Sequence, residues 1–440
     1  MASAQKFWTN KFRILLLPSV LILHTLLIFL RGYFLSIEFT LYPFLRIHGF
    51  LPYQDIIDHH FPSLLFGPFA LPALLTSNPW PLLAVFLTVL CITDILLYGV
   101  LIKFRVRLPL VWTILYVVTS VYFSGNVLWI ETFVNLLITL WLFLSFSDRP
   151  ISKFTSGLLI SQIILLRPTL FPALIFMFFG LSLPVSVFLF IGFIVGLLIP
   201  GIYLYHFNLI DAFYRLAIVF NSQIYPAAAK LLPAKRQVLL LLLWLAPTVY
   251  SLFRNKKYLL LASLFFTLLL VVPRFGFEHL QPLFLIATIY WSLNWKGSGR
   301  MVLAFIIILF SLNLISSVRH PYGNYFFTPQ VQKVSQFVKQ LPGNTIYLLG
   351  ASDLIYPLSG KYPPNFTYLP SLPWYFSQKD FGKKVISSLA GGYTPVVIDF
   401  SATVDGYNVV EKSGPILEYI KMNYNQGETI ENYVIYYPKP

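Results

Sequence analysis

Charge is the first thing that this sequence lacks. Only 11% of its 440 residues are charged and 57% are hydrophobic, whereas soluble domains are about 25% charged. This shortage excludes an ordinary soluble globular protein, and repeated apolar runs of about 20 residues predict a polytopic membrane protein. Most basic residues stand in short loops between these runs, where the positive-inside rule accounts for them. The net charge of +15 therefore does not indicate nucleic acid as a partner.

Cysteine is almost absent too. The single cysteine, Cys91, lies in an apolar run, which excludes an internal disulfide framework. The sequence also has no zinc-type Cys/His spacing, no obvious short-period repeat and no low-complexity tract. The first apolar segment lacks a small-residue cleavage site, so we expect it to remain as a membrane span.

Eleven apolar segments are expected to cross the membrane. Lys6, Lys11 and Arg13 precede the first segment, which predicts a cytoplasmic N-terminus. The stretch 63–75 is short and interrupted by prolines, so we expect it to lie along the outer surface. With this choice the basic clusters between later segments fall on the cytoplasmic side. The eleven segments are 14–34, 80–102, 108–123, 128–146, 154–166, 169–179, 184–205, 238–253, 258–272, 280–293 and 301–315.

The composition changes after about residue 317. Residues 318–440 combine helical patterns at 379–389 and 415–423 with the short β-rich runs TIYLLG, PVVIDF and NYVIYYP, which predicts a small α/β domain. We therefore expect a transmembrane catalytic domain at 1–317, with its first outer loop at 35–79, and an extracytoplasmic α/β domain at 318–440. The predicted location is the plasma (inner) membrane, with membrane lipids as neighbours.

The first outer loop concentrates polar groups. Its stretch EFTLYPFLRIHGFLPYQDIIDHHFP, residues 38–62, holds three of the 16 acidic residues and three of the seven histidines. Glu38 follows the first span directly and could accept a proton from an acceptor hydroxyl. The alternative is a solvated acid at a helix end. Asp55 and Asp58 are the other two carboxylates.

A divalent metal is a second interpretation of this loop. Asp58 with His59 and His60 could bind one. Adjacent histidines on a helix point about 100° apart, so both are not expected to bind one ion. A sugar-binding polar loop is the favoured interpretation, and we assign no metal ligand and no certain cofactor.

Several cations are expected on the outer side, against the positive-inside trend, and a buried charge needs a partner. A phosphate headgroup suits arginine, which can bind it through two parallel hydrogen bonds. Arg167, between two apolar runs, is the most specific of these cations, and Arg46 is another. For the basic residues at 230–236, anchoring to lipid headgroups is the alternative.

Two further groups lie in or beside apolar segments. Glu131 is near the outer end of its predicted span and could line a cavity, whereas Asp94 is expected to be a buried structural partner. In the run RFGFEHLQP, Arg274 and His279 flank Glu278. They could contact the phosphate or the sugar of a donor, or form an interfacial loop.

This arrangement resembles the GT-C superfamily of membrane glycosyltransferases, in particular family 39, the protein O-mannosyltransferase and aminoarabinose-transferase-like enzymes. The resemblance covers about residues 10–317 and rests on IEF, GFLPYQDIIDHHFP, the Glu131 segment, Arg167 and RFGFEHLQP. It implies a polyprenyl-phosphate sugar donor, Glu38 as the base, Tyr53 and Asp55 shaping the site, and Arg167 and Arg274 facing the lipid phosphate. The family usually has Asp, often Asp-Glu, where this chain has Ile-Glu, and some members have a lysine in place of the two histidines.

The sequence therefore predicts an inverting glycosyltransferase that moves a sugar from a polyprenyl-phosphate donor to a hydroxyl on a lipid, glycan or protein at the outer face. The predicted catalytic residues are Glu38 and Asp55. The predicted substrate-binding residues are Arg46, Tyr53, Asp58, His59, His60, Glu131, Arg167, Arg274 and His279. An envelope polysaccharide ligase or polymerase would share this chemistry. The alternative class is a transporter or flippase, which typically has two related halves, a symmetry that this sequence does not display.

Overall fold

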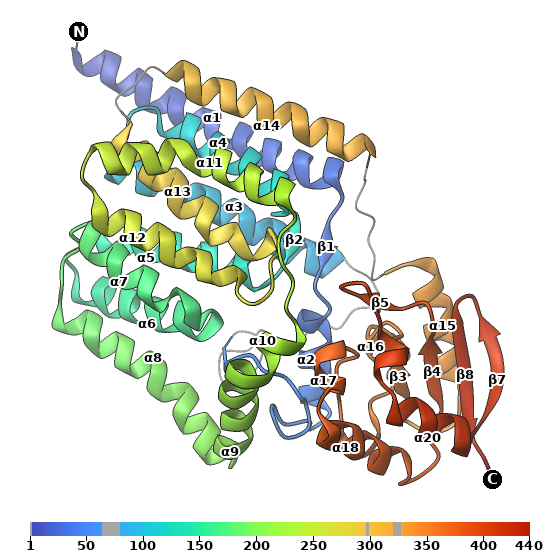
Figure 1. The fold of residues 1–440 in the computed structure, drawn as a ribbon. Coiled ribbons are helices and arrows are strands. Elements are labelled where there is room, and N and C mark those ends of the chain that lie inside the picture. The colour runs from blue at the N-terminus through green and yellow to red at the C-terminus, as the bar shows by residue number, and fades with distance from the viewer. Residues whose placement is uncertain (1, 64–79, 296–298, 320–326) are drawn as a thin grey trace. The chain divides into compact units, whose positions relative to one another are not determined.

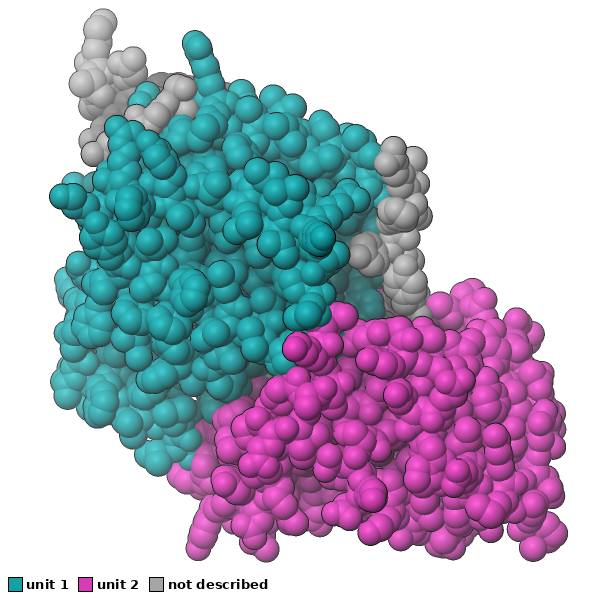
Figure 2. Space-filling model, viewed as in Figure 1, with its two compact units in different colours: residues 1–35, 83–199, 232–324 teal, residues 36–82, 200–231, 325–440 magenta. Residues whose placement is uncertain are grey.

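The computed structural model describes residues 2–63, 80–295, 299–319 and 327–440 (Figure 1). The surface helix predicted at 63–75 falls almost entirely outside the described residues. The chain forms two compact units, which Figure 2 colours teal and magenta. Unit 1 comprises Met1–Leu35, Leu83–Ile199 and Leu232–Asn324, and unit 2 comprises Ser36–Leu82, Pro200–Leu231 and Tyr325–Pro440.

Apolar helices build unit 1, and one helix coincides with each of the eleven apolar segments predicted from the sequence. Within the described residues, four helices are long and apolar enough to cross a bilayer: α3, α8, α11 and α14. The count of eleven spans and their orientation stay predictions. The helices are α1 (Ala2–Arg31), α3 (Trp80–Lys103), α4 (Pro109–Tyr122), α5 (Ile130–Ser145), α6 (Pro150–Leu166), α7 (Phe171–Gly180), α8 (Val187–His206, whose last turns belong to unit 2), α11 (Lys235–Arg254), α12 (Tyr258–Thr267), α13 (Gln281–Asn294) and α14 (Gly299–Arg319).

Helix α13 forms the core of unit 1. Its residues from Gln281 to Ser292 are all buried, and it packs against α4, α5, α11 and α12. A helix that is apolar on every side buries every side, and α13 has no charged residue. Trp291 meets Trp112 of α4 edge to face, with ring centroids 5.2 Å apart. This packing fixes the ends of the surrounding helices.

Short segments connect the ends of several helices of unit 1. The chain after α1 pairs in parallel with the chain before α5, through β1 (Phe34–Leu35) and β2 (Val127–Leu128). Three 3-10 turns connect other helices: η1 (Pro168–Leu170), η3 (Leu268–Val271) and η4 (Glu278–Leu280). In the run before η4, a Cβ at Gly276 would lie 2.1 Å from Glu278 Oε1, so a larger residue there would displace the end of the Glu278 side chain.

A mixed four-stranded sheet forms the centre of the C-terminal part of unit 2, as the sequence predicts. Its order is β3 (Tyr347–Leu349), β4 (Val396–Asp399), β8 (Tyr433–Pro438) and β7 (Tyr424–Ile430). Strands β3 and β4 are parallel, and the other two pairs are antiparallel. The predicted helices are α18 (Lys379–Leu389) and α20 (Pro415–Asn423). The remaining elements are α15 (Pro329–Gln340), α16 (Ile355–Ser359), η5 (Pro364–Phe366), α17 (Pro373–Phe376), β5 (Thr403–Val404), β6 (Tyr407–Asn408) and α19 (Val409–Lys412).

Two segments that the sequence analysis treats only as outer loops contain helices in unit 2. The first outer loop begins with α2 (Glu38–Ile47), whose residues Phe39 to Leu45 are buried. The second segment is the stretch between the predicted spans at 184–205 and 238–253. It forms α9 (Ile210–Phe213), the π-helix η2 (Tyr214–Ile224) and α10 (Tyr225–Ala228). Leu216 and Phe220 of η2 are buried, because Phe220 stacks on the ring of Tyr375, 5.2 Å away. Tertiary packing thus stabilises helices that the composition of these segments does not predict.

Backbone hydrogen bonds join the first outer loop to the C-terminal part of unit 2. Tyr368 N donates to Asp55 O at 2.8 Å, and Ile57 N donates to Tyr368 O at 3.0 Å. Helix α16 also packs against α2. Residues 36–63 therefore fold together with residues 327–440. The predicted division into a transmembrane domain at 1–317 and an extracytoplasmic domain at 318–440 stays a prediction.

Candidate active site

Glu38 is the first residue of α2 and is half-buried as a residue. Ser36 Oγ donates a hydrogen bond to Glu38 Oε2. Burial raises the pKa of Glu38 above its usual range, and the negative charge of Asp58 adds to the rise. The Ser36 hydrogen bond and His60 oppose it. A carboxylate with a raised pKa is suited to accepting a proton.

Asp58 differs from Glu38 because both of its oxygens have partners. Tyr42 donates its hydroxyl proton to Asp58 Oδ2. His60 donates to Oδ1 through its backbone amide at 2.7 Å and through Nδ1 at 2.6 Å. Burial alone would raise the pKa of Asp58, but His60, His59 and the Tyr42 hydrogen bond together lower it below its usual range. Asp58 is therefore a fixed negative charge that orients its neighbours.

The two adjacent histidines lie outside any helix, so the helical geometry used above to separate them does not apply. Their rings stack, with centroids 4.7 Å apart and planes 22° apart. One ligand atom each from Asp58, His59 and His60 lies within 4.8 Å of the others, a donor set that fits a divalent ion. Nδ1 of His59 is 2.5 Å from the Tyr375 hydroxyl. His60 Nδ1 bonds Asp58. These hydrogen bonds involve only the Nδ1 atoms, and a histidine that binds a metal through Nε2 commonly bonds a protein group through its other ring nitrogen.

Tyr53, Asp55 and Arg46 support this loop. Asp55 Oδ2 accepts a hydrogen bond from Leu51 N at 2.8 Å and closes the turn that contains Tyr53, which has a positive φ of 66°. Tyr53 donates its hydroxyl proton to His60 O at 2.8 Å, and Arg46 hydrogen-bonds the Tyr203 side chain. These contacts indicate a turn-closing role for Asp55, and its predicted catalytic role stays a prediction.

Asp353 is a carboxylate that the sequence analysis missed. It follows β3 at the carboxyl end of that strand, and Tyr368 donates its hydroxyl proton to Asp353 Oδ2 at 2.8 Å. Burial raises the pKa of Asp353 to about 7, with a smaller contribution from the charge of Glu38 and an opposing one from the Tyr368 hydrogen bond. The available signal was its position, because ligand-binding residues of α/β sheets gather at the carboxyl ends of parallel strands.

A second cluster, in unit 1, joins three residues that the sequence analysis singled out separately. Glu131 begins α5 and is 1% exposed, and its Oε1 pairs with Arg167 Nη2. His279 Nδ1 is 2.9 Å from the same oxygen and 3.2 Å from Arg167 Nη2. Among the described residues, Glu131 Oε2 and Arg167 Nε have no hydrogen-bond partner. The cluster therefore has one acceptor atom and one donor atom without a hydrogen-bond partner among the described residues.

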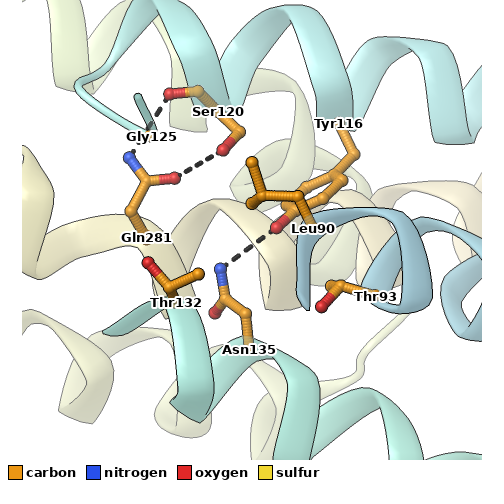
Figure 3. A pocket seen from close by; sticks show the side chains of 8 residues that line it. All are labelled: Leu90, Thr93, Tyr116, Ser120, Gly125, Thr132, Asn135 and Gln281. Atoms are coloured by element: carbon orange, nitrogen blue, oxygen red, sulfur yellow. Dashed lines mark hydrogen bonds between the residues drawn. The ribbon is translucent and has the colours of Figure 1, made fainter. Parts of the chain in front are cut away.

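Other polar residues of unit 1 are internal. Asp94 is fully buried and lies 2.7 Å from His24 Nδ1, which agrees with the structural partnership expected for it. A small cavity lies among α3, α4, α5 and α13 (Figure 3). Asn135 donates to the Tyr116 hydroxyl at 3.1 Å and Ser120 to Gln281 Oε1 at 2.8 Å. At about 10 Å³, the cavity has room for one water molecule and none for a sugar.

No protein-family model and no curated protein sequence matches the chain. Solved structures do match. The crystal structure of ArnT from Cupriavidus metallidurans bound to undecaprenyl phosphate aligns with a TM-score of 0.55 and 11% identity, over 97% of this chain and 98% of that one. The Archaeoglobus fulgidus oligosaccharyltransferase, in complex with zinc and sulfate, aligns with a TM-score of 0.44 and 12% identity, over 95% and 72%.

At these identities the comparisons concern the fold, and the second is too weak to support an argument. The first covers both chains almost completely. It supports the predicted architecture of apolar helices with a small C-terminal mixed sheet. Membership of the GT-C superfamily and of family 39 stays a prediction. Over nearly its whole length, the chain has a fold similar to that of ArnT.

Proposed function

We propose that this protein is a multi-pass membrane glycosyltransferase that moves a sugar from a polyprenyl-phosphate donor to a hydroxyl group of a lipid, glycan or protein. The observation that carries the proposal is the environment of Glu38. The Glu38 carboxylate has a raised pKa and is held by Ser36, with the fixed negative charge of Asp58 acting on it. The fold supports the donor class, because ArnT has a similar fold and its structure contains undecaprenyl phosphate.

Glu38 acts as the general base. It takes the proton of the acceptor hydroxyl while the hydroxyl oxygen attacks the anomeric carbon of the donor. The new carbon–oxygen bond forms as the bond to the phosphate oxygen breaks, so the anomeric configuration inverts and polyprenyl phosphate leaves. Because phosphate is a stable leaving group, one base is enough. The raised pKa makes Glu38 a stronger base than an exposed glutamate.

Arg167 and His279 bind the phosphate of the donor, together with Arg274. A guanidinium group matches phosphate oxygens with two parallel N–H donors. Nη2 of Arg167 pairs with Glu131, whereas its Nε has no hydrogen-bond partner among the described residues. The pair with Glu131 fixes the orientation of the guanidinium group, and the Arg167 side chain is 18% exposed.

The test is covalent sugar transfer by the full-length protein in proteoliposomes, with radiolabelled sugars on undecaprenyl phosphate and a panel of lipid, glycan and peptide acceptors. Wild-type protein is expected to transfer label, and Glu38→Gln is expected to lose at least about 100-fold of the rate. Glu418→Gln, the same change at an exposed position of α20, is the matched control and should retain the rate. If the wild type moves the lipid-linked sugar across the bilayer without covalent transfer, it is a flippase and the proposal is wrong.

A further inference from the structure

The chain between α8 and α11 carries large apolar side chains on its surface. Both flanking helices are long and apolar enough to cross a bilayer, and two consecutive spans leave the residues between them on one membrane surface. Ile210 of α9 is 50% exposed, and Tyr214 and Ile218 of η2 are 57% and 37% exposed. Because these residues are four positions apart, they lie on one face of the helix. An exposed apolar face of this kind marks a contact with a membrane or a protein.

The other side of this helix packs within unit 2. Phe220 is buried and stacks on the ring of Tyr375, with centroids 5.2 Å apart. Asn221 Nδ2 donates a hydrogen bond to His59 O in the first outer loop, at 2.8 Å. These contacts fix the rotation of the helix about its axis, so its apolar face stays outward.

The charge of the connecting segment restricts what covers this face. Residues 207–236 contain one acidic and four basic residues, Asp211 against Arg215, Lys230, Lys235 and Arg236. Arg215 and Lys230 are exposed. A helix that combines an exposed apolar face with neighbouring cations is typical of one that lies in the plane of an anionic membrane surface. The apolar side chains enter the headgroup region, and the cations meet the lipid phosphates.

We propose that α9, η2 and the residues that follow them, up to Lys230, lie along the bilayer surface and bind anionic phospholipid headgroups. Tyr214 lies in the headgroup region, and Arg215 and Lys230 bind the phosphates. Because the same helix bonds His59, it ties the first outer loop to the membrane surface. This role goes beyond the proposed function and does not depend on sugar transfer.

The depth of a spin label tests the position of the helix. The native cysteine is removed by Cys91→Ala, and Tyr214→Cys carries a nitroxide in the full-length protein, in vesicles of equal parts phosphatidylcholine and phosphatidylglycerol. Tyr407→Cys, at a tyrosine of β6 that is 49% exposed, is the matched control. Collisions with oxygen, which concentrates in the bilayer, should outnumber collisions with a water-soluble nickel complex at position 214, and the reverse should hold at position 407. A label at 214 that meets the nickel complex as often as the label at 407 would overturn the inference.

The same label distinguishes lipid from a second copy of the chain. If two copies paired through this face, labels at position 214 would broaden each other's spectra, and dilution with unlabelled protein would remove the broadening. That result would overturn the inference. We expect a spectrum that does not change on dilution.

Lipid binding tests the two cations. Native mass spectrometry of the full-length protein, titrated with phosphatidylglycerol or with phosphatidylcholine, gives the Kd for each lipid. One basic residue near an anionic membrane surface changes Kd about fivefold. Arg215→Gln/Lys230→Gln should therefore weaken phosphatidylglycerol binding at least about tenfold and leave phosphatidylcholine binding within about twofold.

The control for charge is Lys339→Gln/Lys421→Gln. It makes the same change of charge at exposed positions of α15 and α20 and should keep both Kd values. An equal Kd for phosphatidylglycerol in the wild type and in Arg215→Gln/Lys230→Gln would overturn the inference, as would an equal loss in the two double variants.

Discussion

Glu131 and Arg167 form an ion pair in unit 1 although they lie at the ends of different helices. Glu131 is in the first turn of α5 and Arg167 follows the last residue of α6, and both contact His279. Each was singled out from the sequence as an ionisable group in an apolar setting. Their contact explains how this part of the chain accommodates an arginine, because a buried charge requires a partner.

Removing one member of this pair should destabilise the protein more than removing both. Glu131→Gln leaves the Arg167 charge uncompensated, and breaking a buried pair costs about 3–5 kcal/mol. The double variant Glu131→Gln/Arg167→Gln should recover part of the loss in Tm, measured by thermal unfolding in detergent. A double variant that loses the full sum of the two single losses would show that the two side chains do not interact.

Ser36→Ala should move the pH dependence of sugar transfer. The acid limb of kcat/KM reports ionisation of Glu38, and the Ser36 hydrogen bond lowers the pKa of Glu38 against the effect of burial. Without that bond the pKa rises further, so the limb should shift to higher pH. The measurement is the pH–rate profile, with exposed Ser401→Ala as the control. A shift to lower pH would contradict the assignment.

Asp353 should make the stability of the protein depend on pH between about 4 and about 7. Its pKa is about 7 in the folded protein, against a usual 3.8. Between these values the folded protein holds a proton that the unfolded chain has lost, so the free energy of unfolding falls as pH rises towards 7. Asp353→Asn cannot ionise. Its Tm relative to the wild type should therefore be higher at pH 8 than at pH 4.5, by at least about 2 °C. A constant difference would mean that Asp353 has an ordinary pKa.

Asp55 should tolerate an amide but not a methyl group. Its carboxylate closes a turn by accepting a hydrogen bond from Leu51 N, and asparagine retains an acceptor oxygen at that place. Asp55→Asn should keep transfer within about threefold, and Asp55→Ala should lose at least tenfold with a lower Tm, because the turn loses its hydrogen bond. Equal and complete loss in both variants would restore the catalytic role predicted from the sequence.

Chelation should leave sugar transfer unchanged. Both oxygens of Asp58 and the Nδ1 atoms of His59 and His60 have protein partners, and we expect these hydrogen bonds to hold the loop in place when no ion is added. Transfer rates measured before and after treatment with EDTA should agree within about twofold. A loss that Mn²⁺ or Mg²⁺ restores would identify the group of Asp58, His59 and His60 as a metal site.

The sequence was sufficient to predict the apolar helices of unit 1, because a long apolar run predicts a buried or membrane-embedded helix. It did not predict the helices of the two outer loops, α2, α9, η2 and α10. It also predicted the strands that become β3, β4 and β8. It did not predict β7, whose YNQGETI run is polar and gains its pairing from β8. The contact between Glu131, Arg167 and His279 was not predicted, because it depends on how α5, α6 and η4 pack. The separation argued for His59 and His60 failed because it assumed a helix where the chain is irregular.

Asp353 was missed for a related reason. Asp353 is a single aspartate in a domain of ordinary polarity, so the composition around it does not indicate a functional site. It joins the Glu38 cluster only because Tyr368 pairs with the first outer loop, more than 300 positions earlier in the chain. Long-range pairing of this kind cannot be read from local patterns.

The role of Glu38 is tested most directly by measuring the transfer rate and donor binding of Glu38→Gln in parallel. Removal of a general base should reduce the rate about 10²- to 10⁴-fold. The Kd for the polyprenyl-phosphate donor should remain within about threefold of the wild-type value, because glutamine preserves the size of the side chain. A variant that transfers sugar as fast as the wild type would contradict the account.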